Sequence, residues 1–568
     1  MPVLTGIDII GIQSYIFASN RLRDVLSASW MVEHVTSHGS LAQWGLTADR
    51  VLVAAGGNAI LEFPSKPDAK NWTAHYTRWL HETAPGLDAV IAHQPYDRLA
   101  RGLKALQIGL ACQKLERLPN AGQLGLSVTA SCTVTGLPAT HLEKGDLVSP
   151  RVKRLREHIN DARRRWKAFC PHKLEHGPGW SPDFPDELDH MGRTHGGTSL
   201  LGVVHVDANS VGRAIGGWLR RCIEDELDDR VVRTQYCQWS SAITNLGKQI
   251  LHVMADLTAE CVHTETDEDG RERCFLRGTP HELGFALYDS KDNRTFLPLQ
   301  PVLLGGDDLT LVCDGRIALD LAATALHEFE KHKIPHLGEE GGDTILTACA
   351  GVALVKAHAP FYRSYELAEG LCQSAKRLRQ KNNQNRGVET GCWLDWHVGT
   401  TRPGERVEEI RARQYQYGAR TMRPYPLVKS HSRDQSWNWL DEELLGPGRV
   451  ANDSFRGFRH ERDAHDQDRT VFNCWSGSRS RVKRLAFLVS NGGDGVKRQV
   501  EAWRVSDPAV QMPAGLPGDG FLGSETPLLD AIELMDLHLR LEPDPRRADS
   551  DATTAANGIM HPDAKETG

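Results

Sequence analysis

The sequence of 568 residues predicts an α+β protein with two ferredoxin-like domains, a connecting region and a mainly helical C-terminal domain. The chain is long enough for three or four domains of ordinary size. In two separate parts, short apolar runs alternate with amphipathic stretches of helical period, a pattern typical of α/β or ferredoxin-like layers. Each part also holds a double glycine between apolar runs, at Gly56 and Gly57 and again at Gly305 and Gly306, which indicates a duplicated module.

Composition places the chain among ordinary globular proteins. Hydrophobic residues make up 40% and charged residues 25%, and the net charge of -7 excludes a uniformly basic nucleic-acid-binding surface. The first residues lack a secretory signal, and no segment is long and apolar enough for a transmembrane helix. We therefore expect a cytoplasmic protein without membrane contact, whose 12 cysteines are reduced thiols rather than a disulfide framework.

The first domain is expected over residues 1–130. Its strand-like runs are GIDIIGIQSYIF and VLVAAGGNAILEF, and its helical stretches are RLRDVLSASWMVEHVT and AKNWTAHYTRWLHETA. A connecting region follows at 131–196 and contains the cationic run RVKRLREHINDARRRWKAF, in which Trp166 is available for stacking. Two interpretations of this run stay equally open: contact with an RNA backbone or partner subunit, or a solvated helix that joins the two halves.

The second domain is expected over residues 197–400. Its strand-like runs are SLLGVVHVDANSVG, PVLLGGDDLTLVC and ILTACAGVALVK, and its helices are IALDLAATALHEFEKH and YRSYELAEGLCQSAKRLRQK. Helical runs such as SRVKRLAFLVS and TPLLDAIELMDLHLRL predict a mainly helical domain over 401–541. The tail at 542–568 has few apolar residues to bury and is expected to be disordered.

The strongest chemical signal is the stretch GGDD. Gly305 and Gly306 can adopt positive φ, which suits a tight hairpin that a phosphate chain approaches closely. Asp307 and Asp308 then lie at its tip, and Asp207 ends the apolar strand VVHVD upstream. Adjacent carboxylates are the hard oxygen ligands that Mg²⁺ or Mn²⁺ prefers when it also binds phosphates. The alternative is an ordinary turn, since Gly and Asp are common turn residues. The flanking apolar runs favour the metal site.

The order of these motifs resembles the nucleotidyl-cyclase Palm domains, and more closely the large Palm-domain (Cas-ten) subunit family of type III CRISPR effector complexes. The matching segments are DANSVG, GGDD, CAGVALVKAHAPF and AEGLCQSAKRLRQKN in the second half, GIQSYIFASNRLRDVLSASW at the start, and GARTMRPYPL with the helices that follow it. Together these segments cover most of the chain. The resemblance implies two Palm domains, of which the second, with GGDD, is the closer match.

The resemblance also implies an activity and its partners. Members of the family join ATP into cyclic oligoadenylate second messengers when the complex binds foreign RNA, so we expect a metal-dependent nucleotidyltransferase of antiviral defence. Other subunits are expected as partners, with guide and target RNA reached through the complex. Two Mg²⁺ or Mn²⁺ ions held by Asp207, Asp307 and Asp308 can lower the pKa of a ribose 3′-hydroxyl and neutralise the attacked phosphate.

Further residues are candidates for nucleotide binding. Gly305 and Gly306 are expected to lie under the phosphates, and Gly56 and Gly57 to approach ATP from a first Palm that is not itself catalytic. On the helix after ACAGVAL, four cations can hold triphosphate oxygens, and solvated helix charges are the alternative. They are Lys376, Arg377, Arg379 and Lys381, of which Lys376 and Lys381 are the preferred candidates.

The chain also departs from the family. Many members begin with an HD nuclease domain, whereas this chain starts almost at once with GIDIIGIQSYIF, so no HD nuclease activity is expected. The pair His465 and Asp466 is expected at the surface. In the first half, Asn58 stands where a metal ligand is possible, which argues against catalysis there. In the second half, Asn209 stands where the family often has a second aspartate.

A zinc-binding insertion is also common in the family. Here Cys132 has Thr135 in the position expected for its CxxC partner, and Cys170 and His172 add two possible ligands. Because a structural zinc needs about four ligands, no zinc is expected.

Two other functions stay open. One is a stand-alone defence or signalling cyclase with another product, because aspartates and glycines do not reveal the base. The other is a non-catalytic scaffold subunit of the RNA-guided complex, of which Asn58 and Asn209 are early signs.

Overall fold

The computed structural model describes most of the chain up to residue 543. The described residues are 1–117, 128–171, 181–191, 200–266, 270, 272–289, 294–386, 391–399, 401–402, 404–415, 420–428, 435–446, 454–462, 468–489 and 492–543. The predicted disordered tail lies outside them from residue 544 onward, as do His172, His465 and Asp466. Among these residues, no helix is both long enough and apolar enough to cross a membrane.

The N-terminal sheet has four antiparallel strands in the order β2-β3-β1-β4. The strands are β1 (Val3–Ile10), β2 (Val51–Ala55), β3 (Asn58–Phe63) and β4 (Asp88–Pro95), and the helices are α1 (Ile12–Ile16), α2 (Leu22–Val35), α3 (His38–Leu41), α4 (Lys66–Thr83) and α5 (Leu99–Glu116). Helix α4 begins where Ser65 accepts a hydrogen bond from the Asp68 backbone N–H, with a proline in its first turn.

The central sheet has six strands in the order β14-β15-β8-β18-β19-β21. The strands are β8 (Leu200–Ala208), β14 (Leu299–Leu304), β15 (Asp308–Asp314), β18 (Ala348–Lys356), β19 (Trp393–Val398) and β21 (Tyr425–Pro426), and the helices are α8 (Val211–Glu224), α9 (Asp229–Glu260), α10 (Ala318–Lys331) and α11 (Phe361–Arg386). Strand β18 is buried along almost its whole length, which explains its unbroken apolar sequence. Helix α11 packs closely on it, because a Cβ at Gly351 would lie 2.0 Å from the Ala368 carbonyl oxygen.

The two sheets share one connectivity. In each, the first strand lies between the third and fourth, and the second lies outside the third, which is the ferredoxin-like order. The predicted α+β class is therefore confirmed, and the shared order supports duplication. The halves also touch: the ring of Phe17 stacks on that of Tyr365 in α11 with centroids 4.1 Å apart, and the Gln13 side chain donates to the Tyr365 hydroxyl.

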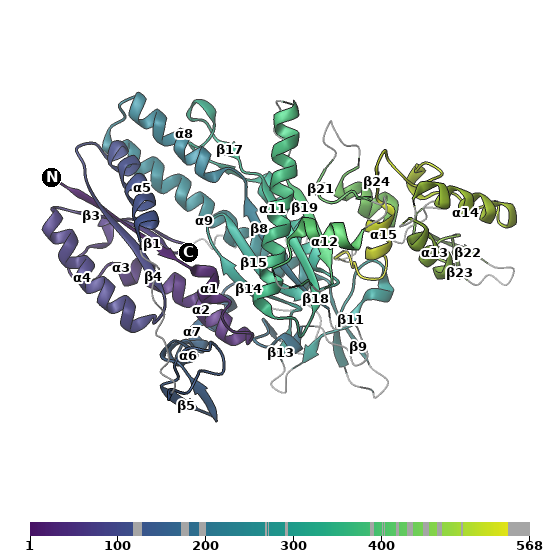
Figure 1. Ribbon diagram of the computed structural model, residues 1–568, viewed down its shortest axis with the longest axis horizontal. Helices are drawn as coiled ribbons and strands as arrows, with labels where there is room; N and C mark the ends of the chain where they lie inside the picture. Colours follow the sequence, from purple (N-terminus) through teal and green to yellow (C-terminus); the bar gives the residue numbers. More distant parts are fainter. Residues whose placement is uncertain are drawn as a thin grey trace, which may run out of the picture.

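The connecting region forms a hairpin and two helices below the N-terminal sheet (Figure 1). These are β5 (His141–Glu143), β6 (Asp146–Val148), α6 (Pro150–Glu157) and α7 (Ile159–Lys167). Its arginines bind acids of the protein itself: Arg156 contacts Glu143 and Asp146, and Arg165 pairs with Glu33. Trp166 is 1% exposed, so the expected stacking surface is wrong for this residue. These ion pairs attach the run to α2 and to its own hairpin, which favours a structural role over contact with an RNA backbone.

Shorter strands lie beside the central sheet. They are β7 (Ser181–Asp183), β9 (Val262–Thr266), β10 (Glu272–Leu276), β11 (Phe285–Ala286), β12 (Tyr288–Asp289), β13 (Arg294–Phe296), β16 (Lys333–Ile334) and β17 (Thr344–Ile345).

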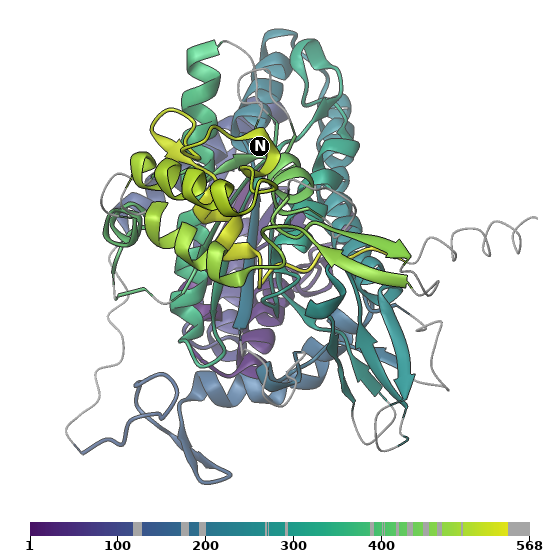
Figure 2. The ribbon, with the colours of Figure 1, turned by 90° about the vertical axis from the view of Figure 1, so that its right-hand side faces the viewer.

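The C-terminal elements are α12 (Val407–Gln414), β20 (Arg420–Thr421), a π-helix (Trp439–Leu445), β22 (Phe458–Arg462), β23 (Asp468–Phe472), α13 (Arg479–Val489), α14 (Gly493–Ser506), β24 (Glu525–Thr526) and α15 (Leu528–Leu534). They extend from the central sheet, beside which α12 lies, to α13, α14, β22 and β23 at the opposite end of the long axis from the N-terminal sheet (Figures 1 and 2). A buried ion pair between Arg423 and Asp530, 2.8 Å apart, joins α15 to the segment before β21.

Candidate active site

The three predicted aspartates meet at one edge of the central sheet. Residues Gly305 to Asp307 connect β14 to β15, and Asp308 begins β15 directly opposite Asp207 of β8. The Ala208 backbone N–H donates to the Asp307 carbonyl oxygen at 3.0 Å. Strand pairing therefore brings together carboxylates that are separated by 100 residues in the chain.

The hairpin needs its glycines for a different reason from the one expected. Neither Gly305 nor Gly306 has a positive φ, so that part of the prediction is wrong. Instead there is no space for a side chain: a Cβ at Gly305 would lie 1.7 Å from Oδ1 of Asp308, and a Cβ at Gly306 would lie 3.2 Å from Cγ2 of Ile243. The Asp308 carboxylate occupies the volume that a residue-305 side chain would fill.

Helix α9 supports the hairpin from behind, a contact that the sequence did not reveal. A Cβ at Gly247 of α9 would lie 3.3 Å from the carbonyl oxygens of both Gly305 and Gly306. The one available signal is the glycine itself, because a glycine inside a helix costs about 1 kcal/mol relative to alanine. Such a residue is retained where a backbone passes close to the helix.

Crowded carboxylates dominate the electrostatics. Burial, followed by the nearby charges of Asp307 and Asp207, raises the pKa of Asp308 to about 7. Burial and the Asp207 charge raise the pKa of Asp307 as well. The Nζ atom of Lys376 in α11 lies 2.6 Å from Oδ2 of Asp207 and donates to the Ala208 carbonyl oxygen. Three carboxylates and one lysine leave an excess of negative charge that a cation would neutralise.

The three aspartates offer carboxylate oxygens, the donor type that Mg²⁺ or Mn²⁺ takes. Within the part of the chain that the structure describes, no group of three or more His, Cys, Asp or Glu side chains is arranged so that it could hold a metal ion by itself. Mg²⁺ in proteins is commonly held by one or two carboxylates together with water and substrate phosphates. One or two of the aspartates would hold such an ion together with water and substrate phosphates.

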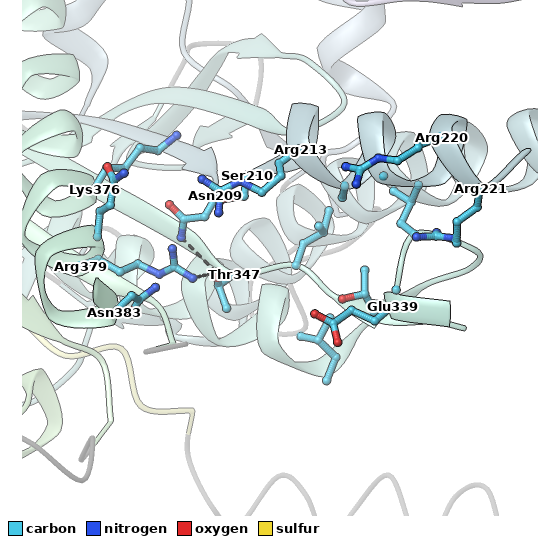
Figure 3. Close-up of a pocket in the computed structure, with 18 of the residues that line it drawn as sticks. Asn209, Ser210, Arg213, Arg220, Arg221, Glu339, Thr347, Lys376, Arg379 and Asn383 are labelled. Carbon is cyan, nitrogen blue, oxygen red and sulfur yellow. Dashed lines mark hydrogen bonds between the residues drawn. The ribbon is translucent and has the colours of Figure 1, made fainter. Parts of the chain in front are cut away.

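A cavity of about 900 Å³ opens beside the aspartates, between α8, α11 and the segment at 337–347 (Figure 3). Lys376 and Asn209 line it, whereas Lys381 is exposed on α11 and is not part of its wall. The Asn209 amide donates to Thr347 Oγ1 at 3.1 Å, and the buried Arg379 guanidinium donates to the same oxygen at 2.8 Å. Asn209 and Arg379 therefore brace the cavity wall.

The first half presents a second hairpin to this site. Gly56 and Gly57, with φ of 58° and 83°, form the two-residue turn between β2 and β3. A Cβ at Gly56 would lie 3.9 Å from the Cα atom of Gly305. The double-glycine turns of the two sheets therefore lie next to each other, with Gly56 facing Gly305.

Cys132 and Cys170, which were considered as zinc ligands, do not lie in a cluster of metal-ligating side chains formed by described residues. Burial raises the pKa of Cys132, but hydrogen bonds from the Thr135 side chain and neighbouring backbone groups outweigh it and lower the pKa to about 7. Burial raises the pKa of Cys170 to about 12. Neither thiol belongs to a set of three metal-ligating side chains among the described residues.

Comparisons with known proteins find distant structural similarity. No family model and no curated protein matches the sequence. Among solved structures, an apo Csm1–Csm4 cassette aligns with a TM-score of 0.49 and 13% identity over 94% of this chain and 70% of that chain. The cassette in complex with cA4 gives 0.48, and the complex with one ATP gives 0.47, each at the same identity and coverage. Identities of 13% with TM-scores below 0.5 establish neither a family nor an activity for this chain.

Proposed function

We propose that the protein is a nucleotidyltransferase that joins ATP into cyclic oligoadenylate with Mg²⁺ or Mn²⁺. The observation that carries this proposal is the register of β8 and β15, which sets Asp207 opposite Asp308 with Asp307 next to it in the chain. Lys376, which pairs with Asp207, also lines the cationic cavity. A metal ion held by these carboxylates would supply acidification of a ribose 3′-hydroxyl and charge neutralisation at the attacked phosphate.

The protein's own groups have separate roles in this reaction. Gly305 lets the Asp308 carboxylate lie against the hairpin backbone, because that carboxylate occupies the space that a side chain at residue 305 would fill. Lys376 releases Asp207 and binds a phosphate oxygen when a substrate enters, since its ammonium lies at the boundary between the aspartates and the cavity. The turn at Gly56 and Gly57 closes the site from the opposite side, next to Gly305.

The assembly is part of the proposal. From the motif resemblance, we propose that the chain acts as the large subunit of a type III CRISPR-like RNA-guided complex, with guide and target RNA bound through other subunits. The domain limits at residues 130, 196 and 400 belong to the same proposal.

One contact favours the scaffold alternative. Lys376 forms its ion pair with Asp207, the position proposed for a metal ligand. In a scaffold this pair is permanent, whereas in an enzyme Lys376 would leave Asp207 free to hold a divalent cation when substrate binds.

The decisive experiment is incubation of the purified protein, alone and with its neighbouring gene products and RNA, with each labelled nucleoside triphosphate and Mn²⁺. The matched control is Asp307→Asn/Asp308→Asn, which keeps the size of both side chains. Product from ATP in the wild type and none in the control supports the proposal, and preference for another nucleotide supports a different cyclase. No product under any condition, with no Mn²⁺ bound, favours the scaffold.

A further inference from the structure

One face of α8 forms a long wall of the cavity. Arg213, Gly217, Arg220, Arg221 and Glu224 line it at helical spacing, so they project from the same side of the helix. A Cβ at Gly217 would have only the end of the Arg221 side chain within 4 Å. Gly217 therefore leaves a groove on the helix surface between Arg213, one turn before it, and Arg220 and Arg221, one turn after it.

The groove carries an excess of positive charge. Five cations and two acids line the cavity: Arg213, Arg220, Arg221, Lys376, Arg379, Glu224 and Glu339. Arg221 donates to the His336 carbonyl oxygen, and Lys376 and Arg379 are bonded as described above. In contrast, neither Arg213 nor Arg220 forms an ion pair with any described acid, and both are exposed. Figure 3 shows both side chains on the cavity side of α8.

The cations follow one line away from the aspartates. Helix α8 begins at Val211, two residues after Asn209, and Arg213 and Arg220 are separated by seven residues, about 10 Å along the helix axis. A single phosphate at Lys376 does not span this length. Arginine binds phosphate by paired hydrogen bonds, so the spacing suits successive phosphates of one ligand.

The far end of the groove is acidic. Glu224 is the last residue of α8, and Glu339 lies on the opposite wall near Arg221 (Figure 3). Carboxylates repel a phosphate chain that continues past this point. The cavity thus has a cationic stretch of limited length.

We propose that this groove binds a short oligonucleotide through its phosphates, with one phosphate group at Lys376 and another between Arg213 and Arg220. This inference rests on the proposed function, because the ligand is then the growing product. Glu224 and Glu339 limit the length of the strand that fits.

The test measures binding without catalysis. Fluorescently labelled linear oligoadenylates with a 5′-triphosphate and one to four nucleotides are titrated with the protein in EDTA at low salt. We expect the affinity of the wild type to rise from one nucleotide to two. In Arg213→Ala/Arg220→Ala, the dinucleotide binds at least tenfold more weakly than in the wild type, while the mononucleotide changes by less than threefold.

The control is Lys70→Ala/Arg78→Ala on α4, which removes the same charge from an exposed helix of the N-terminal sheet and should leave every affinity unchanged. Equal affinity for all lengths in the wild type, or equal losses in the two double variants, overturns the groove. In Glu224→Gln/Glu339→Gln, the tetranucleotide should bind at least threefold more tightly, and no gain overturns the length limit.

The outcome also separates this inference from the proposed function. If the arginines bind the dinucleotide but ATP with Mn²⁺ yields no product, the proposed reaction is contradicted and oligonucleotide binding in the groove is supported. If product forms while the arginine variant binds every length as the wild type does, oligonucleotide binding in the groove is contradicted and the proposed reaction is supported.

Discussion

The two sheets place corresponding residues beside their glycine hairpins but differ in the number of carboxylates. We call this set the frame: an aspartate of the first strand, the hairpin residue opposite it on the third strand, and a lysine of the helix after the fourth strand. In the N-terminal sheet, Asp8 of β1 lies opposite Asn58 of β3. In the central sheet, Asp207 of β8 lies opposite Asp308 of β15. In both, a lysine of the helix after the fourth strand pairs with the first aspartate: Lys114 of α5 with Asp8, and Lys376 of α11 with Asp207.

The difference lies in the hairpins. The N-terminal turn has two residues, because Ala55 pairs with Asn58, whereas the central hairpin is longer, because Leu304 pairs with Leu309. By register, Asn58 stands at the position of Asp308. One aspartate and one lysine balance in the first frame, while three aspartates exceed one lysine in the second. Of the two, the second has the excess of negative charge that a divalent cation would neutralise.

The largest effect is expected from making the second frame resemble the first. Asp308→Asn removes one proposed metal ligand, and we expect product formation to fall by roughly a thousandfold. The reciprocal change, Asn58→Asp, should alter it by less than twofold, because the first hairpin lacks the second carboxylate. Both are measured as initial rates with labelled ATP and Mn²⁺. A loss of similar size in Asn58→Asp would show that both frames take part in chemistry.

The support behind the hairpin gives the next effect. In Gly247→Ala, the added methyl group presses on the carbonyl oxygens of Gly305 and Gly306, and such overpacking costs about 1–3 kcal/mol. We expect Mn²⁺ affinity, measured by electron paramagnetic resonance, to fall about tenfold. The control Gly109→Ala in α5 adds a methyl 3.7 Å from the Cβ atom of Ala92 in β4 and should stabilise the fold by up to about 1 kcal/mol. Unchanged Mn²⁺ affinity in Gly247→Ala contradicts the role of α9.

The paired lysines offer a symmetrical comparison. Lys376→Gln removes the cation between the aspartates and the cavity, so we expect ATP to bind about tenfold more weakly, by roughly 1.4 kcal/mol. Lys114→Gln should change ATP binding by less than twofold, since Asp8 has no second aspartate opposite it. Isothermal titration calorimetry distinguishes the two. Equal losses would place the nucleotide between both frames.

The smallest effect concerns pH. Because burial and neighbouring charges raise the pKa of Asp308 to about 7, the folded state holds this proton more tightly than the unfolded chain does. The free energy of unfolding in EDTA should therefore fall as pH rises from about 4 to about 7, with a slope of at most about 1.4 kcal/mol per pH unit from this group. Asp308→Asn should flatten the curve in urea denaturation. A wild-type curve that rises through this range by the same amount as the variant's contradicts the shift.

Much of the central site was predictable from local sequence. Apolar runs on both sides of GGDD indicated a hairpin, and Asp207 at the end of an apolar run was correctly placed beside it. The reason for the glycines was not predictable, because Gly305 is required by the position of the Asp308 side chain and not by its own φ. Trp166 was also misjudged, since an indole within a cationic run gives no sign of whether the helix turns it inward.

The sequence by itself determined the strands, the hairpins and the identity of the carboxylates, because hydrophobic period and turn residues act over a few positions. The tertiary structure decided which of these features meet. The pairing of Asp8 with Asn58, the support of Gly305 by Gly247 and the groove along α8 join residues from 50 to more than 100 positions apart. Such contacts form only when whole elements pack, so no local pattern records them.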